Sequence, residues 1–116
     1  MEDKKIYDLE ERTYMFAKNC RLLIQSLPKN LSNMEDGKQL IRSSGSIAAN
    51  YIEANEKLGD KDFKFRLKIA RKEAKETLLW LKLLKDLNHN FDSDLETLLN
   101  EADELRKIIS AIINKY

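Results

Sequence analysis

The stretch Ser43–Asn55, SSGSIAANYIEAN, decides whether this chain has one long second helix or two short ones. Six of its first seven residues are Ser, Gly or Ala. A glycine inside a helix costs about 1 kcal/mol relative to alanine, so a flexible loop or a break near Gly45 is one interpretation. However, Leu40, Ile47 and Tyr51 keep a helical spacing across the small residues. This spacing favours an unbroken helix whose lack of side-chain bulk lets a neighbouring helix approach closely.

Apolar residues recur at steps of three and four along the rest of the chain, which predicts helices on both sides of this stretch. Pro28 stops the first helix, and Gly59 can end the second. Ser32 and Ser93 each begin a capping-box pattern, and Asp60 can cap the third helix. The expected helices cover about residues 5–26, 33–58, 60–88 and 93–115. Short connections make neighbouring helices antiparallel, so we predict an all-α fold: one up-down-up-down four-helix bundle as a single domain over residues 1–116.

The composition agrees with a folded helical protein. Of the 116 residues, 35% are charged and 42% hydrophobic, with three Gly and one Pro. The formal net charge is only +1, whereas a strongly cationic nucleic-acid binder has a larger excess. Cys20 has no partner for an internal disulfide and is expected to be a buried thiol. The acidic start and the lack of a long apolar run predict a cytoplasmic protein without a membrane partner.

Paired polar residues on the second and third helices raise the question of a catalytic or metal site. Asn50 and Glu53 are three residues apart and so share a helix face, and Glu73 and Glu76 repeat this spacing. Di-metal sites in bundles need Glu-x-x-His pairs, but the only histidine, His89, lies in a predicted loop. No nucleophile set or phosphate-binding glycine loop is present, so we expect no catalytic residue, metal or cofactor. The four polar residues are predicted to form a structural polar network.

Positive charge is concentrated in one segment. Residues 57–85 hold ten Lys or Arg and four Asp or Glu. Six of these cations follow helical spacing and line one face of the third helix: Lys61, Lys64, Lys68, Arg71, Lys75 and Lys82. Such a face is either simply solvated or contacts nucleic-acid phosphates. Few aromatic residues lie among these cations, so base stacking is not expected.

The segment Leu78–Leu84, LLWLKLL, is apolar on nearly every side of a helix. One surface helix of a small monomer rarely needs that much apolar area. The sequence therefore predicts a homo-oligomer, with Leu79, Trp80 and Leu83 in the interface.

Three segments resemble a known family: IYDLEERTYMFAKNCRLLIQSLPK at residues 6–29, LIRSSGSIAANYIEA at 40–54 and DFKFRLKIARKEAKETLLWLKLL at 62–84. They are similar to the bacterial four-helix-bundle proteins encoded in intervening sequences of 23S ribosomal RNA genes. That family is also related to the accessory variability protein of diversity-generating retroelements. The resemblance implies a four-helix bundle that forms a pentameric ring and has no known enzyme activity.

Two functions follow as expectations. The first is a nonenzymatic, oligomeric bundle protein that associates with RNA or the ribosome through the basic face of its third helix. The alternative is a protein-interaction scaffold or accessory subunit, for example for a reverse transcriptase, with no direct nucleic-acid contact.

Overall fold

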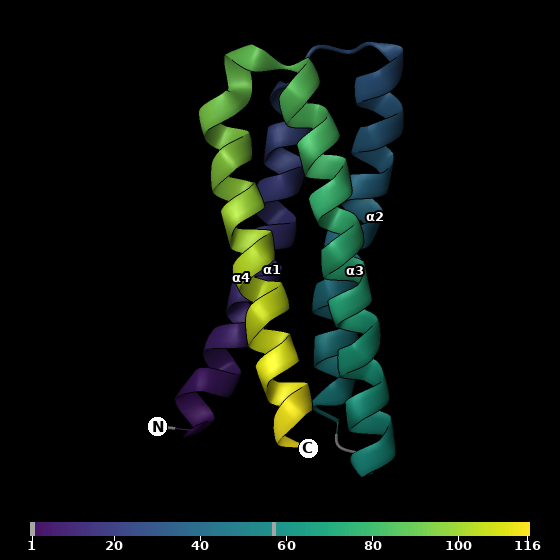
Figure 1. Cartoon of the computed structure of the whole chain (residues 1–116), viewed down its shortest axis with the longest axis vertical. Coiled ribbons are helices and arrows are strands. Elements are labelled where there is room, and N and C mark those ends of the chain that lie inside the picture. Colours follow the sequence, from purple (N-terminus) through teal and green to yellow (C-terminus); the bar gives the residue numbers. More distant parts are fainter. Residues whose placement is uncertain (1, 57) are drawn as a thin grey trace.

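The computed structural model describes residues 2–56 and 58–116, with side chains from Leu9 onward. Four helices, α1 (Glu2–Ser26), α2 (Leu31–Ala54), α3 (Asp60–Leu87) and α4 (Asp92–Lys115), follow one another, and a short 3₁₀ turn, η1 (His89–Phe91), joins the last two. No strand occurs within these described residues. The helices alternate in direction along the long axis of the molecule (Figure 1). The predicted all-α antiparallel bundle is therefore confirmed.

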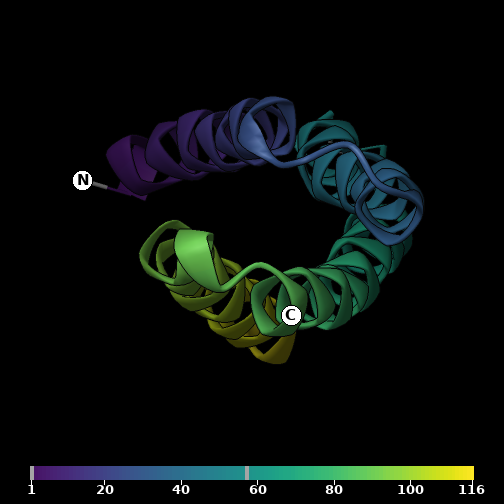
Figure 2. The ribbon, with the colours of Figure 1, turned by 90° about the horizontal axis from the view of Figure 1, so that it is seen from above.

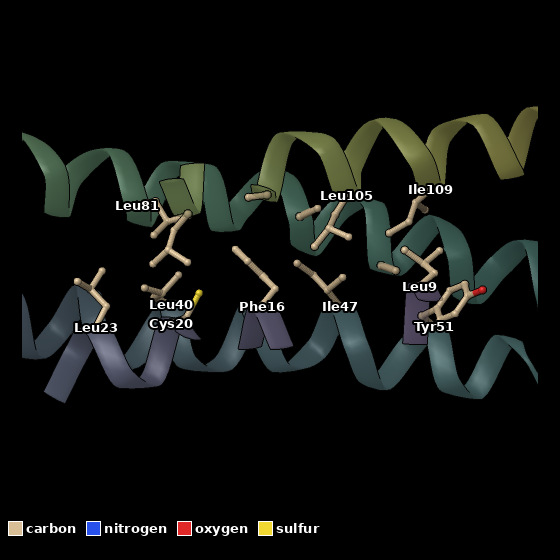
Figure 3. Packing of buried hydrophobic residues seen from close by; sticks show 14 of the residues in the cluster. Leu9, Phe16, Cys20, Leu23, Leu40, Ile47, Tyr51, Leu81, Leu105 and Ile109 are labelled. Carbon is tan, nitrogen blue, oxygen red and sulfur yellow. The ribbon is translucent and has the colours of Figure 1, made fainter. Parts of the chain in front are cut away.

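The hydrophobic core runs along the inside of the bundle. Seen from above, the helices succeed one another around the centre in chain order, with α2 packed closely against α3 and α3 against α4 (Figure 2). Apolar side chains from all four helices meet between them (Figure 3). The labelled members are Leu9, Phe16, Cys20, Leu23, Leu40, Ile47, Tyr51, Leu81, Leu105 and Ile109.

The small-residue stretch is part of one continuous helix, because α2 runs unbroken from Leu31 to Ala54. The absence of a side chain at Gly45 leaves room for Arg21 of α1, whose Nη2 would lie 3.0 Å from an added Cβ. The same nitrogen donates a hydrogen bond to the Ile41 carbonyl at 3.2 Å. The small residue thus lets a long polar side chain of α1 lie across α2, and the interpretation of a helix break is excluded.

The predicted end of the second helix at residue 58 is wrong, since α2 already ends at Ala54. Two antiparallel helices that lie side by side need a connection that reverses the chain, and Gly59 is the last residue of that connection. Gly59 has φ of +145°, a conformation that residues with a Cβ rarely adopt. It is the residue before α3, so Asp60 is the first helical residue and not the cap.

The predicted capping boxes do not form. The cap of α2 is Asn30, whose side chain accepts a hydrogen bond from the Asn33 backbone N–H at 2.9 Å. Ser32 instead donates to the Asn30 side chain at 3.2 Å. At the other site the 3₁₀ turn continues directly into α4, so Phe91 precedes the helix without a side-chain cap and Asp92 begins it.

Cys20 is a free thiol with no exposed surface, as predicted. Burial raises its pKa to about 12 because the thiolate would lose its hydration inside the core. In the described part of the chain, no helix combines the length and apolar character needed to cross a membrane.

Candidate nucleic-acid interface

The outer face of α3 carries the cluster of cations that the sequence indicates. The opposite face is fixed in the core by Leu67, Ala74 and Leu81, none of which exposes any surface. We call six cations on the side of α3 away from the core the basic ridge: Lys61, Lys64, Lys68, Arg71, Lys75 and Lys82. Lys64 and Arg71 are half-buried, and the other four are exposed. At 1.5 Å per residue, the ridge extends over about 31 Å of helix.

Ion pairing separates the ridge from two cations on the flanks of α3, Arg66 and Lys85. Lys72, an exposed cation beside the ridge, is absent from the salt bridges of the described residues, as the ridge cations are. Arg66 pairs with Glu53 of α2 at 2.9 Å, and Lys85 lies 4.0 Å from Glu96 of α4. Among the described residues, no ridge cation forms a salt bridge. The reason is geometric, since acidic side chains of α2 and α4 reach the flanks of α3 but not its outer face. The ridge therefore keeps positive charge that the protein's own carboxylates leave uncompensated.

The centre of the ridge borders a shallow, open hollow on the surface of α3. Its lining residues are Lys68, Arg71, Lys72, Lys75, Glu76 and Leu79. An open, elongated cationic surface can contact a chain of phosphates, whereas a small-molecule site is usually a concave, mostly apolar pocket.

The four predicted network residues do not form one network, and they separate into three sets. Arg42 of α2 brings Glu73 and Glu76 together, with nitrogen–oxygen distances of 3.2 and 2.8 Å. Asn50 donates to the Ser46 carbonyl of its own helix at 2.9 Å, so the structure does not join it to these carboxylates. Glu53 pairs separately with Arg66. The Arg42 pairs tie α2 to α3 at mid-length, next to a 2.8 Å contact between the hydroxyls of Ser43 and Thr77.

A buried amide pair holds the end of the bundle and was missed by sequence reasoning. Asn33 of α2 donates to the Asn88 side chain at 2.9 Å, and Asn88 donates back at 2.8 Å. The second N–H of each side-chain amide donates to a backbone carbonyl, that of Asn33 to Pro28 and that of Asn88 to Leu84. Both side chains are buried, at 4% and 8% exposure. The pair therefore fixes α2 against the last turn of α3 and the preceding loop.

A second polar tie joins the first and last helices. The Arg12 guanidinium donates two hydrogen bonds to the Glu101 carboxylate, at 2.7 and 2.8 Å. Hydrogen bonding to Glu101 raises the pKa of Arg12. Arg12 therefore links α1 to α4 and, unlike the ridge cations, is not free to bind a phosphate.

The predicted interface residues differ in accessibility. Leu79 and Leu83 are 51% and 37% exposed, and Leu87 continues the same side of α3 at 60%. Trp80 is half-buried, and its indole N–H is enclosed without a hydrogen-bond acceptor. Of the other leucines in residues 78–84, Leu81 and Leu84 belong to the core, and Leu78 is partly buried against it.

His89 is exposed and lies 3.9 Å from Asp92. No group of three or more His, Cys, Asp or Glu side chains in residues 2–56 and 58–116 is arranged to hold a metal ion.

Comparisons with known proteins place this geometry in context. A family model described as 23S rRNA-intervening sequence protein matches residues 5–111. A crystal structure from Bacteroides thetaiotaomicron, of a protein with unknown function from the S23 ribosomal protein family, is 31% identical. The match covers 90% of this chain and 97% of that one, with a TM-score of 0.81. No curated protein matches the chain. The relation to the retroelement accessory protein stays a prediction.

Proposed function

Because the chain belongs to the 23S rRNA-intervening sequence protein family, we propose that it is a nonenzymatic RNA-associated protein whose basic ridge contacts phosphates. The observation that carries this proposal is the pairing contrast on α3. Cations on its flanks are paired with carboxylates, and those on its outer face are not. Such an RNA-associated role would place the protein in the bacterial cytoplasm.

The ridge supports RNA binding through local charge, since the net charge of the whole chain is only +1. Each unpaired cation that meets a phosphate releases a condensed counterion, which makes the affinity fall linearly with the logarithm of salt concentration. A cation already held by a carboxylate would have to give up that pair first. The unpaired ridge is therefore the surface where phosphate binding costs the protein least.

The test is the salt dependence of binding to a fluorescein-labelled RNA, measured by anisotropy between about 50 and 200 mM salt. The ridge variant changes Lys64, Lys68, Arg71 and Lys75 to Gln. A matched control changes the exposed cations Lys18, Lys29, Lys38 and Lys115 to Gln. Each variant removes four positive charges, which takes the net charge from +1 to −3.

The two variants should behave differently if the ridge is the contact surface. The ridge variant should bind RNA more weakly. Its slope of log affinity against log salt concentration should be shallower by about 3, because each of the four lost phosphate contacts to a single strand contributes about 0.7. The control should keep most of the slope, because its cations lie elsewhere on the molecule. Equal losses in both variants would mean that only net charge matters, and would refute the ridge as a site.

We further propose that the protein is a homo-oligomer, and the family resemblance makes a pentamer the expected assembly. The supporting observation is the exposure of Leu79 and Leu83 on a helix that already supplies Leu81 and Leu84 to the core. Apolar area of this kind gains free energy when a second copy covers it.

Sedimentation velocity tests this assembly with a pair of double variants. Changing Leu79 and Leu83 to Gln should dissociate the oligomer, whereas changing Leu22 and Leu31, which are 49% and 79% exposed on other helices, should not. A wild-type monomer at micromolar concentration would refute self-association, and a clean dimer would refute only the number five.

The alternative function, a scaffold for a protein such as a reverse transcriptase, makes a distinct prediction. Protein docking rests on a few desolvated anchors and responds weakly to salt. A pull-down from the native host with and without nuclease separates the two. Retention of RNA that depends on the ridge supports the first proposal, and a protein retained after nuclease treatment supports the alternative.

A further inference from the structure

Two phenylalanines near the start of α3 have different environments. Phe63 packs against the core, and its ring meets Tyr116 edge-on, with centroids 5.0 Å apart and planes at 68°. Phe65 is 58% exposed and is absent from the core cluster. The Phe63 ring therefore contributes to the packing of the bundle, whereas most of the Phe65 ring is accessible to solvent.

The position of Phe65 on the helix places it beside the basic ridge. Residues three and four apart are surface neighbours on a helix, so Lys61 and Lys68 lie on either side of Phe65 along the axis. Lys72 follows one further turn along the same side. The Arg66 guanidinium carbon is 6.0 Å from the Phe65 ring centroid, at the limit of a cation–π contact. Arg66 is itself held by Glu53, so its place beside the ring is fixed.

This arrangement combines the two elements that bind single-stranded nucleic acid. Cations contact the phosphates, and an exposed aromatic ring stacks on an unpaired base. A duplex cannot use the ring, because its bases already stack on one another inside the helix. Few aromatics lie among the cations in the sequence, but the structure shows that one of them is both exposed and adjacent to two ridge lysines.

We propose that Phe65, flanked by Lys61 and Lys68, is a base-stacking platform that gives the ridge a preference for single-stranded RNA over duplex RNA. The inference rests on the proposed function, since it assigns the form of RNA that the ridge takes. Stacking is insensitive to the identity of the base, so the site does not read a sequence.

The test measures anisotropy with a labelled oligouridine and with a labelled RNA duplex of equal length. Phe65→Ala should weaken binding of the single strand by about 5- to 150-fold, the range of base–aromatic stacking. Its salt slope should not change, because no phosphate contact is lost. Phe65→Trp should restore affinity, and Phe65→Leu should not, since leucine keeps apolar area without a π-face.

Tyr14→Ala is the matched control. Tyr14 is an aromatic residue of nearly equal exposure, 56%, on α1. It should leave both affinities unchanged. Because Phe65 is largely exposed, circular dichroism and thermal unfolding should show that each variant keeps the wild-type fold.

The outcomes separate the two proposals. Single-strand binding that depends on the ridge cations but is unaltered in Phe65→Ala would overturn this inference and leave the proposed function standing. Equal or tighter binding of the duplex would also overturn it. Absence of any RNA binding by the wild-type protein would overturn both.

Discussion

Replacing Asn88 with alanine should lower the free energy of unfolding by about 2–4 kcal/mol. The change removes a side chain that donates to Asn33 Oδ1 and to the Leu84 carbonyl, both at 2.8 Å. The two acceptors lose these buried partners, and each unsatisfied buried group costs about 1–3 kcal/mol. The lower end of the sum applies because water can reach the end of a bundle. Asn33→Ala should cost a similar amount, since the Asn88 side-chain oxygen and the Pro28 carbonyl lose their hydrogen-bond donor.

The double variant distinguishes a coupled pair from two independent losses. When both amides are removed, neither is left behind without its partner, so the combined cost should fall short of the sum by about 1–3 kcal/mol. Changing Asn33 and Asn88 together to leucine should remove the cost of the amide–amide contact, because apolar groups then replace both partners, and leave only the cost of the unsatisfied Pro28 and Leu84 carbonyls.

Urea unfolding followed by far-ultraviolet circular dichroism measures these differences. Protein concentration must be held constant, because self-association would add to the apparent stability. If the single changes cost under about 0.5 kcal/mol, or the costs simply add, the amide pair does not hold the bundle end and the reasoning fails.

Three further changes test other parts of the fold. Gly59→Ala should lower the free energy of unfolding by about 1–3 kcal/mol, because alanine is strained at a φ of +145°. An added Cβ meets nothing within 4 Å, so backbone strain is the only cause. An unchanged urea midpoint would contradict this prediction. Arg42→Ala should lower the free energy of unfolding by about 1–2 kcal/mol because the buried carboxylate of Glu73 loses its cation. The cost is smaller than for a fully buried ion pair, since Arg42 is half-exposed. Lys38→Ala, which removes an exposed ion pair, should cost almost nothing. The Cys20 pKa of about 12, against 9.0 for an ordinary thiol, means that its stabilising contribution is complete below pH 9 and is lost as the pH rises toward 12. The stability difference between wild type and Cys20→Ala should therefore be constant below pH 9 and shift only above it, and a flat difference up to pH 12 would be the contrary result.

Apolar spacing was sufficient to predict which face of each helix is buried. Leu67, Ala74 and Leu81 are seven residues apart, and all three are fully buried. The helix ends were less predictable, because Asn30 and Ser32 are both good capping residues two positions apart. Which of them caps depends on where the chain leaves α1, and that is decided by tertiary packing and not by local propensity.

The long-range contacts could not be predicted from the sequence. Asn33 and Asn88 are 55 residues apart, and neither belongs to a motif that indicates the other. The cations of the ridge could be placed on one face from spacing alone. That these cations form no ion pairs could not be predicted, because the acids that pair with neighbouring cations, Glu53 and Glu96, come from other helices.

The outer face of α3 has two sides, and this bears on how RNA binding and self-association can coexist. Lys64 and Arg71 precede Lys85 by three and two heptads, and Lys85 approaches Glu96, so this part of the ridge lies toward α4. Leu83 follows Glu76 by seven residues, and Glu76 pairs with Arg42, so the exposed leucine lies toward α2. A neighbouring copy that covers Leu83 from the α2 side would leave Lys64 and Arg71, on the α4 side, open, although Leu79 lines the hollow beside Lys68 and Lys75. Phe65 lies on the same side of α3 as Leu83 but about 27 Å nearer the start of the helix, so it stays open only where the contact is confined to the end of α3. Each added copy would then contribute one more ridge, and several ridges on one RNA bind more tightly than one because later contacts are intramolecular.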